Sequence, residues 1–363
     1  MNGHTPLTPL PVTDGDSVIT SPLPLPGRVR WKVRPAMRLL AVYMVLAALL
    51  YVALRNVPLH EIGTTIRQLQ LWQIGTVLGL NLFIYALITL RWWIIVRAEN
   101  KRVLYFPLLL VRIAVFGISY FTLGPHVGGE PLQVFYLQRK YKMTFTHATA
   151  SVIMDKLLEL LANFFLLAVG LTAILRAGIL SISGNGSWLS LGGLVVLCLW
   201  PPVHIIFLYK RKYPISALLR SIPFIKKDSK PVRFIAASER LAGTFCRRHL
   251  SALVAATAVS ICAGMGMVGE FALLVSFLGI QLPFWQTIAA WTAGWLALLV
   301  PLPGGLGALE ASEVFALGIF GISAALAISV TLVMRARDIL IGGLGLLFAS
   351  RAIKIENHVR GPV

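Results

Sequence analysis

The chain has 363 residues, of which 57% are hydrophobic and only 13% are charged, and its mean hydropathy is +0.79. This balance excludes an ordinary soluble globular protein, and apolar runs of about 20 residues favour a polytopic membrane bundle. The net charge of +19 is also typical of nucleic-acid binding, but the basic residues fall between the apolar runs and no nucleic-acid motif accompanies them. Nucleic acid is therefore not expected as a partner.

Motifs for catalysis and metal binding are absent from the sequence. The three cysteines show no metal-ligand or CxxC spacing, and the seven histidines form no HExxH-like cluster. A P-loop and a nucleophile motif are missing as well. We therefore expect no metal, no cofactor and no catalytic residues, and predict that the protein is not an enzyme.

The N-terminal region differs from the rest of the chain. Residues 1–27 contain six prolines and little that could form a core, and a basic flank follows up to residue 36. This composition predicts a disordered cytoplasmic tail over 1–36. The first apolar span covers roughly 37–54, and because no clear small-residue cleavage site follows it, we expect a retained anchor rather than a secretory signal.

Eight further apolar runs follow. A Pro/Gly-rich motif interrupts the pattern twice, and each motif has a glutamate as its last residue or the one before it. The breaks are residues 124–131 (GPHVGGEP) and 301–310 (PLPGGLGALE). Interrupted backbone at membrane depth persists only where protein or a wet cavity covers it. Two breaks at matching places in two halves indicate a transporter-type site near the midplane. The runs cover 71–96, 104–122, 146–175, 188–209, 250–279, 284–300, 308–322 and 323–350.

Most lysines and arginines fall on one side of the membrane if 104–138 and 284–322 are re-entrant hairpins, which leave the membrane on the side where they entered it. Twenty-four then lie in cytoplasmic segments, three lie in outside loops, and six lie within spans. The positive-inside rule favours this topology. The prediction is an all-α polytopic membrane protein with about six transmembrane helices, two re-entrant helical hairpins and both termini in the cytoplasm.

This topology makes the transmembrane domain, 37–350, an inverted repeat. Its halves, 37–175 and 188–350, have the same order of elements in opposite orientations. Residues 210–249, with eleven basic and two acidic residues, are expected to form a cytoplasmic loop attracted to anionic lipid head groups, either as an anchor or to recruit substrate. Residues 351–363 form a cytoplasmic tail.

The same motifs resemble the lysylphosphatidylglycerol synthase transmembrane-region family, also called flippase-like membrane proteins. The resemblance covers about residues 37–350. The matching stretches are RWW at 91–93, GGEP at 128–131 with QVFYL at 133–137, DKLLE at 155–159, and the second break at 301–310.

The resemblance implies an integral protein of the plasma (inner) membrane that moves polar or polyprenyl-linked lipids between leaflets. Family members that make lysylphosphatidylglycerol carry a soluble aminoacyl-transferase domain after the membrane part, and this chain ends at Val363, so synthase activity is not expected. The alternative is a non-transporting subunit or scaffold for a lipid-modifying enzyme or glycosyltransferase. The role of His126, which stands where an apolar residue is expected, is open, as are the lipid, the direction and energy coupling of its movement, and the oligomeric state.

Two glutamates, Glu130 and Glu310, follow the glycine breaks and are therefore expected near the start of the second helix of each hairpin. A carboxylate complements a helix N-terminus by only about 0.3–1 kcal/mol, whereas a charge at bilayer depth costs at least about 2.5 kcal/mol. We therefore expect a transport role, with a structural one as the alternative. The break glycines would expose N–H groups to anionic head groups or simply permit the turn. These candidates are Gly128, Gly129, Gly304 and Gly305.

Further intramembrane charges complete the set of candidates. Asp155 and Glu159 share one helix face and suggest a cavity wall. In the corresponding span of the second half, Arg337 and Asp338 suggest either phosphate binding or a salt bridge between the halves. Arg112 and Glu270 are lone charges within apolar runs. We expect Arg91, beside two tryptophans, to reach the cytoplasmic interface as an anchor.

Overall fold

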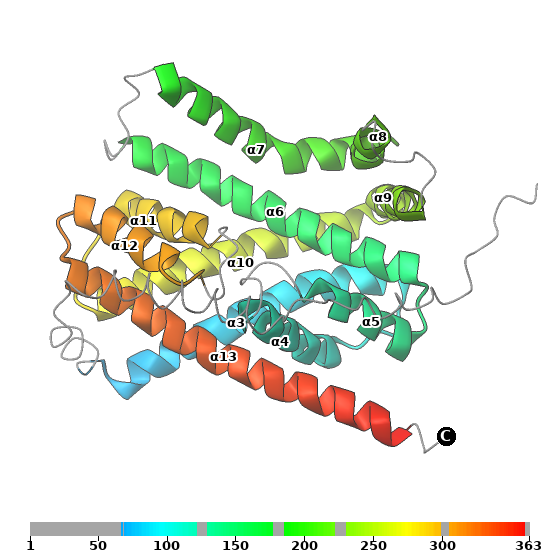
Figure 1. Ribbon diagram of the computed structural model, residues 1–363, viewed down its shortest axis with the longest axis horizontal. Helices are drawn as coiled ribbons and strands as arrows, with labels where there is room; N and C mark the ends of the chain where they lie inside the picture. Colours follow the sequence, from blue (N-terminus) through cyan, green and yellow to red (C-terminus); the bar gives the residue numbers. More distant parts are fainter. Residues whose placement is uncertain are drawn as a thin grey trace, which may run out of the picture. The chain divides into compact units, whose positions relative to one another are not determined.

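The computed structural model describes residues 67, 69–121, 129–176, 185–221, 230–298 and 305–359, all within one unit that spans residues 46–363. Within these residues every regular element is an α-helix, and the helices number eleven (Figure 1). The all-helical prediction is confirmed for this part of the chain. The predicted tail 1–36, the predicted first span 37–54 and residues 122–128 and 299–304 lie outside the described residues, so Gly128, Gly304 and His126 do as well.

Two groups of four helices repeat the same order of lengths: long, short, short, long. The first group is α3 (Leu71–Glu99), α4 (Tyr105–Phe121), α5 (Glu130–Tyr141) and α6 (Phe145–Arg176). The second group is α10 (Leu250–Phe277), α11 (Phe284–Ala297), α12 (Ala308–Ile319) and α13 (Ala324–Val359). Each predicted apolar run after the first is thus helical, and each break separates two short helices, α4 from α5 and α11 from α12.

Three helices join the groups, namely α7 (Asn185–Tyr209), α8 (Pro214–Ser221) and α9 (Lys230–Arg248). The basic segment 210–249 is therefore largely helical rather than a simple loop. The reason lies in its apolar residues, because Ala242, Phe245 and Cys246 recur at helical spacing and are buried where α9 packs against α6 and α7.

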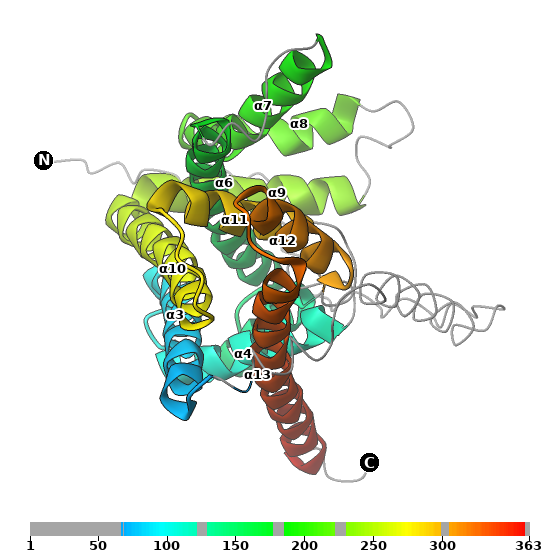
Figure 2. The same cartoon turned by 90° about the vertical axis from the view of Figure 1, so that its left-hand side faces the viewer.

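Helices of the first group pack against helices of the second group. Helix α3 packs along α10, α4 packs against α13, and α6 packs against α11 (Figures 1 and 2). Small residues allow the α4–α13 contact, since a Cβ on Gly117 or Gly345 would overlap a backbone carbonyl of the facing helix. At the α6–α11 contact, Gly170 faces the side chain of Thr292.

Helices α3 and α10 have 29 and 28 residues, and among the described helices these two are long and apolar enough to cross a membrane. At 1.5 Å per residue each is about 40 Å long, enough to cross a hydrocarbon core of about 30 Å. Large apolar side chains point outward from them, such as Phe83, 57% exposed, and Val254, 61% exposed. This outer surface suits lipid better than water, and the prediction of six spans stays a prediction.

Candidate functional site

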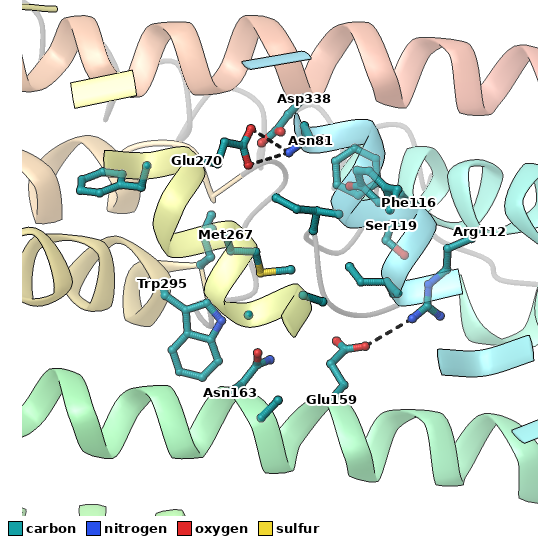
Figure 3. A pocket seen from close by; sticks show the side chains of 18 of the residues that line it. Asn81, Arg112, Phe116, Ser119, Glu159, Asn163, Met267, Glu270, Trp295 and Asp338 are labelled. Atoms are coloured by element: carbon teal, nitrogen blue, oxygen red, sulfur yellow. Dashed lines mark hydrogen bonds and ion pairs between the residues drawn. The ribbon is translucent and has the colours of Figure 1, made fainter. Parts of the chain in front are cut away.

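A cavity of about 210 Å³ lies between the two groups of helices (Figure 3). Apolar side chains from α3, α4, α10 and α11 form part of its wall, and polar and charged side chains form the rest. The charged lining comprises four cations, Arg91, Arg112, Lys156 and Arg337, and five carboxylates, Glu130, Glu159, Glu270, Glu313 and Asp338.

In the first group of helices, two arginines each contact the same two carboxylates. Asp155 on α6 is fully buried, and its Oδ1 accepts a hydrogen bond of 2.6 Å from Nε of Arg91. Its Oδ2 lies 2.9 Å from Nη1 of Arg112 in an ion pair without hydrogen-bond alignment. Glu159 accepts from Arg91 at 3.0 Å and lies 3.6 Å from Arg112, the contact drawn in Figure 3.

This network corrects the expectation for Arg91. The side chain does not reach an interface as an anchor, because Arg91 is only 2% exposed and its guanidinium faces α6. A buried guanidinium is stabilised where carboxylates accept from it, and here two of them do so. Asp155 and Glu159 therefore meet cations rather than each other.

Lys156 extends the same network to the first break. Its Nζ lies 3.1 Å from Glu159 and 3.3 Å from Oε1 of Glu130, the first residue of α5. The ion pair therefore ties the start of α5 to α6. Glu130 lines the cavity at the predicted helix N-terminus.

A second network joins α3, α10 and α13. Both carboxylate oxygens of Glu270 accept from Nδ2 of Asn81, at 3.0 and 2.9 Å, as Figure 3 shows. Arg337 donates from Nη1 to Glu270 and, at 2.9 and 2.8 Å, to Oδ1 of Asp338. The salt bridge of Arg337 is thus within the second half, while Asn81 makes the link between the halves. The sequence analysis did not single out Asn81, although an amide inside an apolar run was a signal.

Glu310 makes a local structural contact. Its carboxylate accepts two hydrogen bonds from Arg335 on α13, one of 2.8 Å from Nη2, and a third of 2.9 Å from the N–H of Gly307. Arg335 also donates to the carbonyl of Gly305 at 3.1 Å. This arrangement closes the N-terminus of α12 and matches the structural alternative weighed for Glu310, which does not line the cavity.

The two described break glycines are constrained differently. A Cβ on Gly129 would lie 2.6 Å from the carbonyl oxygen of Val115, so the backbone of α4 leaves no room for a side chain. Gly305 has φ of +63°, a left-handed conformation that favours glycine. Gly129 thus allows close packing against α4, and Gly305 allows the backbone to turn before α12.

Glu313 is a cavity residue that the sequence analysis missed. It is 1% exposed, and both carboxyl oxygens have no hydrogen-bond partner within the part of the chain that the structure describes. The signal was available, since Glu313 is a second acidic residue in the short apolar run that begins at Ala308.

The charged positions of the two groups correspond along their helices. Arg91 follows the start of α3 at Leu71 by the same interval by which Glu270 follows the start of α10 at Leu250. In the same way, Lys156 of α6 corresponds to Arg335 of α13, and Glu159 corresponds to Asp338. In both groups an ion pair joins the first long helix to the last one, Arg91 with Glu159 and Glu270 with Arg337. Another ion pair joins the last long helix to the second short one, Lys156 with Glu130 and Arg335 with Glu310.

Comparison with known proteins gives one match. A family model described as the lysylphosphatidylglycerol synthase transmembrane region matches residues 38–345, which include both breaks and both charged networks. No curated protein and no solved structure matches the chain. Among the described residues, no group of three His, Cys, Asp or Glu side chains is placed to hold a metal ion.

Proposed function

We propose that this membrane protein, which belongs to the lysylphosphatidylglycerol synthase transmembrane-region family, moves polar lipid head groups between leaflets through its cavity. One observation carries the proposal: a cavity with charged walls lies among helices whose outer surfaces are apolar. A purely structural membrane domain gains little from such a cavity, because replacing buried ion pairs with well-packed apolar side chains is often neutral or stabilising.

The physical task of such a protein is limited to the head group. The acyl or polyprenyl tails stay in the bilayer while the polar part crosses, so the main barrier is the loss of hydration of that part. Charged and amide side chains in the cavity replace water as hydrogen-bonding partners. This role needs no bond to be made or broken, so we infer a transporter rather than an enzyme.

The arginines of the cavity are the residues we expect to meet an anionic head group. Arg112 and Arg337 both point their guanidinium groups at carboxylates that line the cavity, Glu159 and Glu270 respectively. A guanidinium has five N–H donors in a planar fork that suits phosphate as well as carboxylate. A phosphate entering the cavity would share or take over these donors.

We further infer that the two groups of helices are inverted halves with re-entrant hairpins. The matching order of helix lengths supports this, as do the exchanged contacts of α4 with α13 and of α6 with α11. The sorting of lysines and arginines supports cytoplasmic termini in the inner membrane. In such an arrangement the two hairpins approach one midplane site from opposite sides.

The test is head-group movement in vesicles of phosphatidylethanolamine and phosphatidylglycerol that contain the full chain. A lipid with a fluorescent label on its head group reports each leaflet when a membrane-impermeant reductant quenches the outer one. We expect the protein to speed loss of the inner-leaflet signal, and Arg337→Ala and Glu130→Gln to slow it. Arg97→Ala, an exposed arginine on α3, is the matched control.

Two outcomes would contradict the proposal. If vesicles with the protein behave like vesicles without it, the alternative of a scaffold for a lipid-modifying enzyme is favoured. If the protein moves lipid but both cavity variants keep the full rate, the charges are structural and the path lies elsewhere.

A further inference from the structure

Glu313 stands apart from the other acidic residues of the cavity. It lies on α12 one turn after Glu310, and its carboxyl group lies against α11, where a Cβ on Gly294 would overlap Oε1. Trp291 and Trp295, on either side of Gly294 in the chain, line the same cavity. The carboxyl group of Glu313 therefore lies between α11 and the cavity and is shielded from bulk solvent.

The charged groups around Glu313 are all engaged with other partners. On its own helix, Glu310 is held by Arg335 of α13. Also on α13, Arg337 is bonded to Asp338 and to Glu270 of α10. Helix α11, which packs directly against Glu313, contains no charged residue.

Across the cavity, the cations and carboxylates of α4, α5 and α6 pair with one another or with Arg91 of α3. Glu313 thus has no described cation to stabilise an ionised form.

Elementary electrostatics then fixes the charge of Glu313 in this arrangement. An isolated carboxylate removed from water is so unfavourable that the group binds a proton instead. A neutral carboxyl group is still an unsatisfied donor and acceptor, and buried polar groups of that kind are rare where no function keeps them. A leucine would fill a similar space without an unsatisfied polar group.

We propose that Glu313 is a proton-binding site of the cavity, neutral in the arrangement seen here and ionised when the cavity opens to water. On opening, the O–H bond of the carboxyl group breaks and the proton passes to water. On closing, the carboxylate takes a proton from water before it is enclosed. Opening and closing then release and take up one proton at this position, which would make movement through the cavity depend on pH.

The existence of the proton site does not depend on lipid transport, whereas its coupling to head-group movement rests on the proposed function. The first experiment therefore measures protonation directly. Dicyclohexylcarbodiimide dissolves in the bilayer and forms stable adducts with protonated carboxyl groups, which peptide mass spectrometry locates in the full chain in phosphatidylethanolamine and phosphatidylglycerol vesicles.

We expect an adduct on Glu313 at neutral pH that decreases as the pH becomes alkaline, and no adduct on the arginine-paired Glu270 and Glu310. Glu313→Gln removes the adduct, while Glu99→Gln, at the exposed end of α3, leaves it unchanged. Equal labelling of Glu270 and Glu313, or labelling of Glu130 in the cavity without labelling of Glu313, would overturn the proposal.

A second measurement decides the case in which the reagent labels no cavity residue. Infrared difference spectra between neutral and alkaline pH should contain the carbonyl stretch of a protonated carboxyl group, lost in Glu313→Gln and kept in Glu99→Gln. A spectrum that is the same in wild type and Glu313→Gln would overturn the proton site. An adduct on Glu313 in a protein that moves no lipid would instead overturn the proposed function and leave the site standing.

Discussion

One connected network of α3–α6 joins three cations with three carboxylates. In α10–α13, by contrast, two separate pairings join two arginines with three carboxylates, and a fourth acid, Glu313, is left over. The first set is balanced, so its charges hold one another in place. The second set is not balanced, and its extra acid, Glu313, is the group whose charge can change. The difference assigns a fixed role to the first half and a responsive role to the second.

The same comparison shows what the two halves share. Arg91 and Glu270 occupy corresponding positions on the first long helix, and each pairs with the last long helix of its own half, although their signs are reversed. An ion pair at this position needs one charge of each sign, and either helix can supply either one. The two halves therefore carry a paired charge at the same position with opposite sign.

The largest expected effect comes from the contact of α4 with α13. We expect Gly345→Val to abolish folding or to lower the melting temperature strongly, because a side chain there would overlap the backbone carbonyl of Ile113. Gly343→Val on the same helix, where a Cβ would meet nothing within 4 Å, is the matched control. Fluorescence-detected size exclusion after heating measures both. Equal loss in the two variants would show that this close contact does not hold the halves together.

The next effect comes from the balanced network. Arg91→Ala would leave Asp155 and Glu159 with fewer cations, and breaking a buried pair in this way costs about 3–5 kcal/mol. Arg337→Ala should cost less, because Glu270 keeps both hydrogen bonds from Asn81. Arg97→Ala, on the exposed side of α3, should be close to neutral. Thermal or denaturant unfolding in detergent gives the ranking.

A reversed ranking of these variants would contradict the comparison. If Arg337→Ala costs more than Arg91→Ala, the second half is the more tightly held one. A fixed role for the first network would then be wrong.

A smaller effect separates the two glutamates of α12. Glu310→Gln weakens the contacts with Arg335 and with the N-terminus of the helix, and loss of a charged hydrogen bond of this kind costs about 1–3 kcal/mol. Glu313→Gln removes no ion pair and should leave the melting temperature unchanged or slightly raised. Thermal unfolding of both variants at neutral pH makes the comparison. A clear loss of stability in Glu313→Gln would indicate that Glu313 has a structural partner.

Much of the fold was predictable, because the apolar runs and the Pro/Gly breaks are local signals. Helices α3, α4, α6, α10, α11 and α12 begin and end close to the predicted runs, whereas α13 extends nine residues past its run and α5 matches no run. Glu130 and Glu310 lie in the first turns of α5 and α12, as predicted. Partner choice was not predictable, since it depends on helices far apart in sequence. The sequence places Arg91 beside Trp92, but only the packing of α3 against α6 brings it to Asp155. The partners of Asn81 and the isolation of Glu313 were hidden for the same reason.

The native cysteines influence how the orientation of the halves can be measured. Cys246 is buried on α9, with its Sγ 4.0 Å from Sδ of Met154, and burial raises the pKa of its thiol to about 11. Because maleimides react with the thiolate, we expect Cys246 to stay unlabelled in the folded protein near neutral pH and to react only after denaturation. Labelling of Cys246 in the native protein would show that α9 detaches from α6. Replacing Cys198 and Cys262 with serine then gives a silent background.

The orientation of the two halves around the cavity is tested directly by placing one cysteine in each of two corresponding turns. Lys142 lies between α5 and α6, Ser323 lies between α12 and α13, and both are exposed. A membrane-impermeant maleimide is applied to intact cells and to inverted membrane vesicles. The account predicts that Lys142→Cys reacts only from the cytoplasmic side and Ser323→Cys only from the outside. Labelling of both positions from the same side would contradict it.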